Sequence, residues 1–143
     1  MKQVRDLLAY KGGQIWSVSP NATVFETLQL MAEHEIGAVL VMEGTKTVGI
    51  ISERDYARQV ILKGKASRDT PVREVMTARV VYVRPEQTVD DCMALMTDKR
   101  IRHLPVVEDG AVIGVLSIGD VVKAMISEKE FLIEQLENYI STG

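Results

Sequence analysis

The sequence predicts a mixed α/β (α+β) fold built from two β-α-β-β-α motifs and a C-terminal helix. Three observations support this prediction. The chain is internally duplicated, each copy contains short runs rich in β-branched residues, and each copy contains apolar residues at helical spacing. At 143 residues, the chain fits the usual prior of roughly 100–200 residues per domain. We therefore expect residues 1–143 to form a single module.

The duplication appears when the sequence is shifted by 65 residues, which aligns residues 18–60 with residues 83–125 without a gap. The segments before them also correspond, with a short insertion near residues 11–13. The motifs therefore span residues 4–62 and 72–126, separated by a polar linker at 63–71. The identical pairs include Pro20 with Pro85, Thr23 with Thr88, Gly49 with Gly114, Ser52 with Ser117, and Asp55 with Asp120.

Each copy begins with an extended segment and a helix. Residues 15–19 and 80–84 are rich in β-branched and aromatic residues and are followed by a proline, which is typical of a short strand that ends in a turn. A threonine then caps a helix with an apolar face, and an acidic residue three positions later suits a capping box, with Asp the poorer partner. These pairs are Thr23 with Glu26 and Thr88 with Asp91.

Two apolar strands joined by a hairpin turn follow in each copy, and a second helix begins after Ser52 or Ser117. The strands are predicted at residues 38–42, 47–51, 104–107 and 112–116. Residues 127–143 have no counterpart after the first copy. Their apolar residues recur at helical spacing, so we expect an amphipathic helix that continues or follows the last one.

Composition excludes several functional classes. The formal net charge of −3 argues against nucleic-acid binding through bulk positive charge. The single cysteine, Cys92, cannot form an internal disulfide and lies on an apolar helix face, which favours a core position and a reducing compartment. The N-terminal residues lack the apolar core of a signal peptide. The apolar runs are also shorter than the roughly 20 residues that span a membrane. We therefore expect a cytoplasmic protein without a membrane partner.

The segment with most chemical information occurs twice, as Gly-apolar-apolar-Ser-x-x-Asp at residues 49–55 and 114–120. Backbone N–H groups at a helix start favour phosphate, and the serine hydroxyl can donate to a phosphate oxygen. The aspartate in the first helical turn can accept hydrogen bonds from the two ribose hydroxyls. The same Ser-x-x-Asp spacing is also a helix cap. Its occurrence twice, after the same strand pattern, favours a nucleotide site, and both roles are compatible.

This motif, with Ile-Arg-His-Leu-Pro-Val-Val at residues 101–107, resembles the cystathionine-β-synthase (CBS) domain, and the resemblance covers about residues 4–126. Two tandem CBS domains form a CBS pair, or Bateman module. The resemblance implies that the two copies pack about a pseudo-two-fold axis and leave two clefts between them. Such clefts commonly bind AMP, ADP, ATP, NAD(H) or S-adenosyl compounds. It also implies that modules often assemble into flat homodimers.

The resemblance further implies which residues bind the ligand. Asp55 and Asp120 correspond to the ribose-binding aspartates, and Ser52 and Ser117 to the hydroxyl beside ribose and phosphate. The other implied residues are Ile15, Trp16, Val80 and Val81 along the base, Leu104 and Pro105 (with Val39 and Leu40 in the first copy) on the next strand, Thr77 near the ligand, and Arg54, Arg102 and His103 at positions suited to phosphate.

The two copies differ in their charged residues. Arg102 and His103 stand where the first copy has Gly37-Ala38, whereas Arg54 stands where the second copy has Gly119. Arginine and histidine can contact phosphate. A solvated charge is the alternative for Arg102, and a satisfied, partly buried side chain is the alternative for His103. We expect at least one competent site, the one that contains Asp120.

Three functions follow from these patterns. The first is a stand-alone sensor that binds an adenine nucleotide and passes a conformational change to an unknown effector protein. The second is a dimerisation scaffold in which the aspartates only cap helices. The third is a nucleotide-acting enzyme, but no convincing catalytic set appears, and His34, His103 and Cys92 are too scattered for a metal site. We therefore expect no catalytic residue and no metal.

Overall fold

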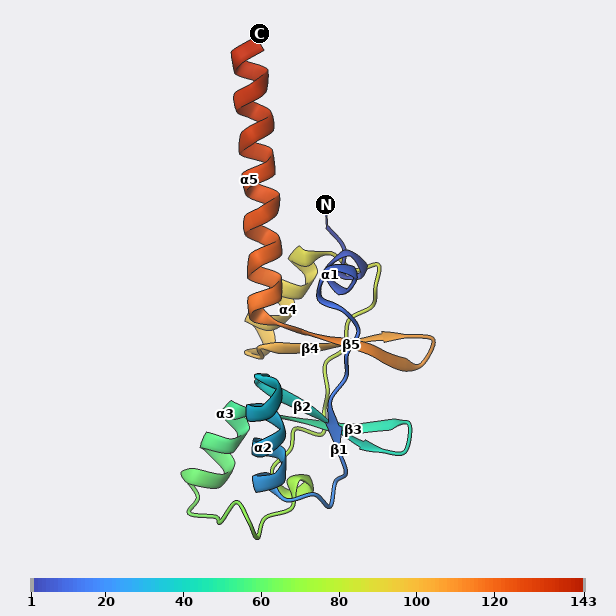
Figure 1. Ribbon diagram of the computed structural model, residues 1–143, viewed down its shortest axis with the longest axis vertical. Coiled ribbons are helices and arrows are strands. Elements are labelled where there is room, and N and C mark those ends of the chain that lie inside the picture. The colour runs from blue at the N-terminus through green and yellow to red at the C-terminus, as the bar shows by residue number, and fades with distance from the viewer. Residues whose placement is uncertain (1, 143) are drawn as a thin grey trace. The chain divides into compact units, whose positions relative to one another are not determined.

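The computed structural model describes residues 2–142 and divides into two compact units. The central unit is Ile15–Val81. The terminal unit joins Met1–Gln14 to Tyr82–Gly143. Each unit carries helices beside a small sheet, so the predicted α+β class is confirmed (Figure 1). Within the described residues, no helix combines the length and apolarity needed to cross a membrane.

The central unit is a three-stranded sheet with helices. Strand β1 pairs in parallel with β2, and β2 pairs antiparallel with β3, as expected for a hairpin that follows a crossover helix. Its core is formed by buried aliphatic residues from every part of the unit, including Val24, Val39, Ile51, Val60 and Val72. The elements are β1 (Ser17–Val18), α2 (Val24–His34), β2 (Ala38–Glu43), β3 (Lys46–Ser52), α3 (Glu53–Tyr56), a π-helix (Ala57–Ile61) and a 3-10 helix (Val72–Glu74).

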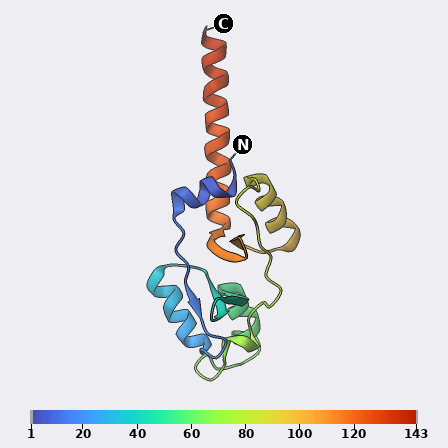
Figure 2. The ribbon, with the colours of Figure 1, turned by 90° about the vertical axis from the view of Figure 1, so that its right-hand side faces the viewer.

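The terminal unit has a two-stranded antiparallel sheet and three helices. Its elements are α1 (Val4–Lys11), α4 (Val89–Lys99), β4 (His103–Glu108), β5 (Ala111–Ser117) and α5 (Ile118–Thr142). The predicted C-terminal helix continues directly from the last motif helix, and in Figures 1 and 2 it runs well beyond α1 and α4. Gly143, the last residue of the predicted segment, lies outside the described residues, as does Met1.

The strand predicted at residues 80–84 is wrong as a regular element, because only one parallel bridge forms there, between Val83 and Val106. The sequence contains the reason. In the central unit, Leu40 N–H donates to the carbonyl oxygen of Trp16 at 3.2 Å and ties β1 to β2. The residue at the matching position of β4 is Pro105, which has no N–H to donate.

The segments that lead into the two motifs are exchanged between the units. Helix α1 begins the first motif in the sequence but packs in the terminal unit, where Val4 N–H donates to the carbonyl oxygen of Gln87 at 2.8 Å. Residues 72–77 begin the second motif but pack in the central unit, where Thr77 and Ile50 exchange both backbone hydrogen bonds at 2.8 and 3.0 Å. Each unit therefore contains a leading segment from the other copy.

Each exchanged segment lies against a glycine of the repeated motif. A Cβ atom on Gly114 would lie 2.6 Å from Cδ2 of Leu8, and one on Gly49 would lie 2.5 Å from Sδ of Met76 and 3.0 Å from the carbonyl oxygen of Thr77. These distances are too short for a real side chain. A side chain at either glycine would therefore force Leu8 or Met76 to shift, so the glycine that precedes the apolar-apolar-Ser segment permits the close approach of the leading segment.

The close approach at Gly114 can be tested by a double-mutant cycle. Gly114→Ala should destabilise the protein by about 1–3 kcal/mol, because the new methyl group overlaps Leu8. Leu8→Ala removes the overlapping atoms, so the cost of Gly114→Ala should be smaller in that background. Urea unfolding of the four proteins measures the coupling. Additive effects would contradict the packing described here.

The second prediction concerns Cys92, which is fully buried in α4. Burial raises the pKa of its thiol, and the neighbouring Asp91 carboxylate raises it further, to about 11. The reactive thiolate is therefore scarce near pH 8, so the folded protein should react slowly with a disulfide reagent and quickly once denatured in urea. Equal rates in the two states would show that the thiol is accessible.

Candidate functional site

The two Ser-x-x-Asp motifs occupy the same kind of junction, where a strand ends and a helix begins. Ser52 is the last residue of β3 and pairs with Ala38, while Ser117 is the last residue of β5 and pairs with His103. The next residue ties each junction to the other strand of the hairpin. Glu53 N–H donates to the carbonyl oxygen of Gly37 at 3.0 Å in the central unit. Ile118 N–H likewise donates to the carbonyl oxygen of Arg102 at 2.8 Å in the terminal unit.

Both aspartates close a capping interaction with their serine. Oδ2 of Asp55 accepts from the backbone N–H of Ser52 at 2.9 Å and lies 3.0 Å from its Oγ. The corresponding distances from Oδ2 of Asp120 to Ser117 are 2.7 and 2.9 Å. In each motif the aspartate N–H also approaches the serine Oγ at 3.3 Å. The capping interpretation is therefore correct for both motifs, and it places the bonds on a single carboxylate oxygen.

Lys11 makes the terminal unit's motif different from that of the central unit. Its Nζ lies 2.6 Å from Oδ2 of Asp120 and donates to the carbonyl oxygen of Val115 at 2.7 Å. Lys11 is the last residue of α1, so the exchanged segment brings it to Asp120. Sequence reasoning missed this residue, because it lies at the insertion where the two copies do not align.

The charge state of Asp120 follows from these contacts. Burial by itself would raise the pKa of this carboxyl, but the hydrogen bonds from Lys11 and Ser117 and the positive charge of Lys11 outweigh burial and lower the pKa. The carboxylate is therefore ionised at neutral pH. Its contribution to stability is present above the unfolded-state pKa of about 3.9 and is lost as the pH falls through the lower folded-state value.

Thr77 takes the corresponding place in the central unit. Its Oγ1 approaches Oδ1 of Asp55 at 3.4 Å, which is a weak hydrogen bond, and its backbone bridges to Ile50. The structure therefore brings Thr77 to the motif with Asp55 and gives the two motifs different neighbours.

An aromatic pair lies beside the first strand of the central unit. The Trp16 ring stacks on His34, with centroids 3.5 Å apart and planes inclined by 13°. Trp16 is half-buried next to β1, and His34 is the last residue of α2. Their contact stacks the Trp16 ring on a helix end next to β1. Trp16 and His34 were named separately from the sequence. Their stacking could not be predicted, because the two residues lie on separate elements.

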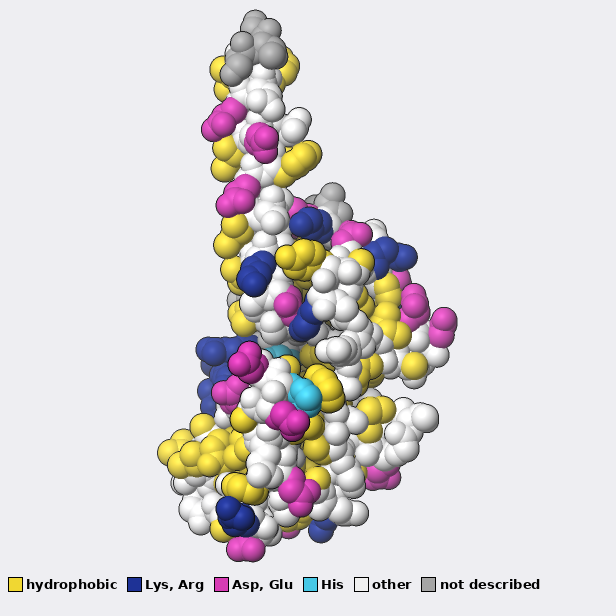
Figure 3. Space-filling view, viewed as in Figure 1, with side chains coloured by type: hydrophobic (Ala, Val, Ile, Leu, Met, Phe, Trp, Pro, Cys, Tyr) yellow, Lys and Arg dark blue, Asp and Glu magenta, His cyan; other side chains and the backbone are white. Residues whose placement is uncertain are grey.

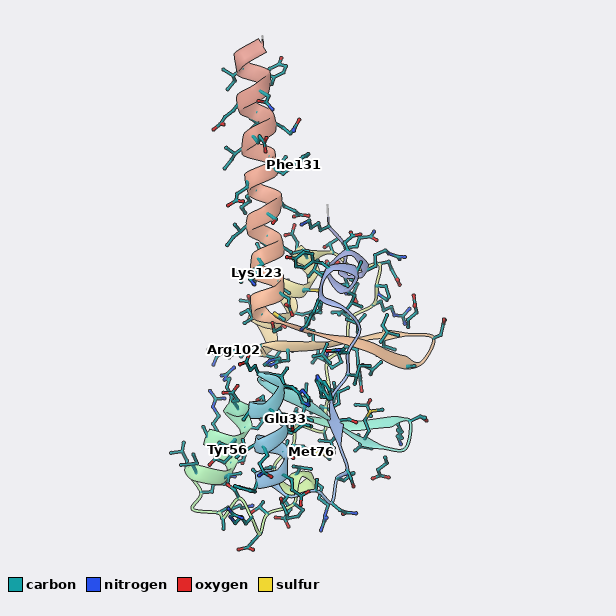
Figure 4. The ribbon with its side chains drawn as sticks, in the orientation of Figure 1. Glu33, Tyr56, Met76, Arg102, Lys123 and Phe131 are labelled. Atoms are coloured by element: carbon teal, nitrogen blue, oxygen red, sulfur yellow. The ribbon has the colours of Figure 1, made fainter. Side chains whose placement is uncertain are left out.

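The remaining predicted residues have the following positions. In the central unit, Ile15, Val80 and Val81 are half-buried outside regular strands, and Arg54 lies in the short helix α3. In the terminal unit, Leu104 and Pro105 are buried in β4, His103 opens that strand, and Arg102 is exposed just before it (Figure 4). In the part of the chain that the structure describes, no three His, Cys, Asp or Glu side chains are grouped to hold a metal ion.

Comparison with known proteins gives a consistent result. The model of the CBS domain family matches residues 4–61 and 72–127. The mitochondrial CBS domain-containing protein CBSX3 of Arabidopsis thaliana is 40% identical over 137 residues, covering 92% of this chain and 66% of its own length. The chain therefore spans slightly less than two thirds of that relative.

Solved structures show the same similarity. A putative signal-transduction protein with CBS domains from Burkholderia ambifaria is 48% identical with a TM-score of 0.85, over 88% of this chain and 95% of that one. A CBS domain protein from Pyrobaculum aerophilum, solved in complex with AMP, is 24% identical and shares the fold with a TM-score of 0.74, over 83% of this chain and 89% of that one. The family match covers most of the chain in two tandem segments, and the chain belongs to the CBS domain family.

Proposed function

We propose that the protein is a regulatory module that binds an adenine nucleotide at its Ser-x-x-Asp motifs and signals by conformational change to an effector protein. The observation that carries this proposal is the repeated junction of β-strand, serine and helix-borne aspartate in both units. Each junction presents a carboxylate in the first turn of a helix, with one oxygen held by the cap. The other oxygen is suited to accept a ribose hydroxyl.

AMP is the first ligand to test, followed by ATP and NADH. An AMP-bound protein shares the fold, which supports this order. The proposal places no catalytic step on the chain. The described residues contain no grouped metal ligands, and the aspartates are engaged in capping rather than positioned beside a nucleophile. We propose regulation rather than catalysis because the aspartates are engaged in capping. We also propose a cytoplasmic location, which the free thiol of Cys92 suits.

We also propose that the protein is a homodimer joined in part through α5. Ile126, Ile133 and Ile140 recur every seven residues on this helix, as a positions of a heptad do. Leu136 occupies the d position of the second heptad, and Lys129 occupies that of the first. Ile at a with Leu at d favours two parallel strands. The four apolar side chains are 52–76% exposed, and Figure 3 shows hydrophobic side chains along the helix. Most of the stability of a helix in a protein comes from packing its apolar face, so a second copy of α5 would stabilise this exposed helix.

Ligand binding is tested by calorimetry with AMP, ATP and NADH, and Trp16, the only tryptophan, provides a parallel fluorescence signal. Asp120→Asn should weaken binding about tenfold or more at its motif, because the ribose loses a charged acceptor. Asn preserves an oxygen for the cap. The matched control is Asp109→Asn, which makes the same charge change at an exposed turn residue with φ of 52°, where Asn is tolerated.

If none of the three ligands binds below millimolar concentration, the sensor proposal fails and the dimerisation scaffold remains. A scaffold predicts that Asp120→Asn changes stability alone, by up to roughly 1 kcal/mol, because the substitution keeps the cap oxygen but removes the charge paired with Lys11. Equal loss of affinity in Asp120→Asn and Asp109→Asn would show a general charge effect rather than a site.

The dimer is tested by light scattering after size-exclusion chromatography. The chain mass is 15.9 kDa, so a dimer should have twice that mass. Ile133→Glu should shift the protein toward the monomer, because two buried charges would face each other at an a position. The exposed control Asn138→Glu should leave the mass unchanged. A monomeric wild-type protein would exclude this proposal.

A further inference from the structure

We propose that Lys11 is a specificity-determining residue that makes the Asp120 motif prefer phosphorylated nucleosides over nucleosides. This inference rests on the proposed function and names the ligand class for one of its two motifs. The structural basis is the position of the Lys11 ammonium, which bridges Oδ2 of Asp120 at 2.6 Å and the carbonyl oxygen of Val115 at 2.7 Å.

The ammonium has one donor left for a ligand. A lysine ammonium carries three N–H groups, and two of them are accounted for by Asp120 and Val115. Both partners belong to the body of the terminal unit, so Lys11 is fixed beside the carboxylate although its side chain is 38% exposed. A ligand that binds its ribose hydroxyls to Oδ1 of Asp120 can turn its 5′-phosphate toward this cation, within the distance of about 8 Å over which charges interact in physiological salt.

Charge balance explains why the phosphate matters. Asp120 alone would repel a phosphate, since two anions would share a partly buried site. With Lys11 in place, the carboxylate and ammonium form a neutral pair that can accept ribose hydroxyls and still attract an anionic group. The same pair gives a neutral nucleoside no comparable advantage.

The motif with Asp55 serves as an internal comparison. There the exchanged segment brings the neutral Thr77, whose Oγ1 lies 3.4 Å from Asp55, in place of a cation. The discrimination that we assign to Lys11 is therefore specific to the terminal unit. The Asp55 motif should not distinguish a phosphorylated from an unphosphorylated nucleoside by this means.

The alternative is that Lys11 has only a structural role (a structural tie), because its two hydrogen bonds also join the end of α1 to β5 and α5. The two roles predict different binding behaviour. A tie would position Asp120 for every ligand, so its loss would weaken AMP and adenosine equally. A charge that contacts phosphate would affect AMP alone.

The experiment compares AMP with adenosine in the Asp55→Asn background, which leaves a single intact motif. Lys11→Met should weaken AMP about tenfold or more, as expected for a lost charge-assisted hydrogen bond, and leave adenosine within about threefold. Lys11→Arg retains the charge and should keep most of the preference. Lys99→Met makes the same charge change at the exposed end of α4 and should alter neither ligand.

A second measurement uses the Asp55→Asn protein with Lys11 intact, in case the Lys11 variants fold poorly. Raising the salt concentration should weaken AMP binding and leave adenosine binding nearly unchanged. Only AMP carries a charged group, its phosphate, that contacts the Lys11 ammonium, and salt screens that attraction. Parallel losses for both ligands in Lys11→Met, or no loss for either, overturn the specificity role while leaving the proposed function intact. Failure of both ligands to bind the Asp55→Asn protein overturns both proposals for the Asp120 motif.

Discussion

The close packing of an exchanged segment against a glycine is the constraint on which the rest of the structure depends. Leu8 lies on Gly114 in the terminal unit, and Met76 lies on Gly49 in the central unit. Each contact packs the exchanged segment on a strand of a small sheet of two or three strands. The same segments place Lys11 next to Asp120 and Thr77 next to Asp55. The segments that pack on the two sheets therefore also determine the neighbours of the two aspartates.

Much of this organisation could be predicted from the sequence. The duplication, the two hairpins, the capping threonines and the C-terminal helix depend on local patterns, and local patterns are readable in a single chain. The prediction for residues 80–84 failed because Pro105, distant in sequence, removes a donor from the neighbouring strand. The exchange of leading segments could not be predicted either, since the alignment of the copies indicates that each segment stays with its own motif.

The candidate site shows the same division. Ser52, Asp55, Ser117 and Asp120 were identified from spacing, and the structure gives them matching cap geometry. Lys11 was missed for two reasons. Its partner Asp120 is 109 residues away, and Lys11 lies at the insertion where the first copy does not align with the second. The cap and the proposed ligand site are compatible because they use different oxygens of one carboxylate. A residue that stabilises a helix start is in this way already oriented before any ligand arrives.

The continuity of α5 has a mechanical consequence. Asp120 stands in the first turn of a 25-residue helix, and at 1.5 Å per residue that helix is a rod roughly 37 Å long. A rod transmits a rotation at its base as a displacement at its tip, in proportion to its length. A tilt of about 5° at the first turn would therefore move the far end by roughly 3 Å. A small adjustment at the carboxylate would therefore become, at the far end of the helix, a movement the size of a side-chain contact.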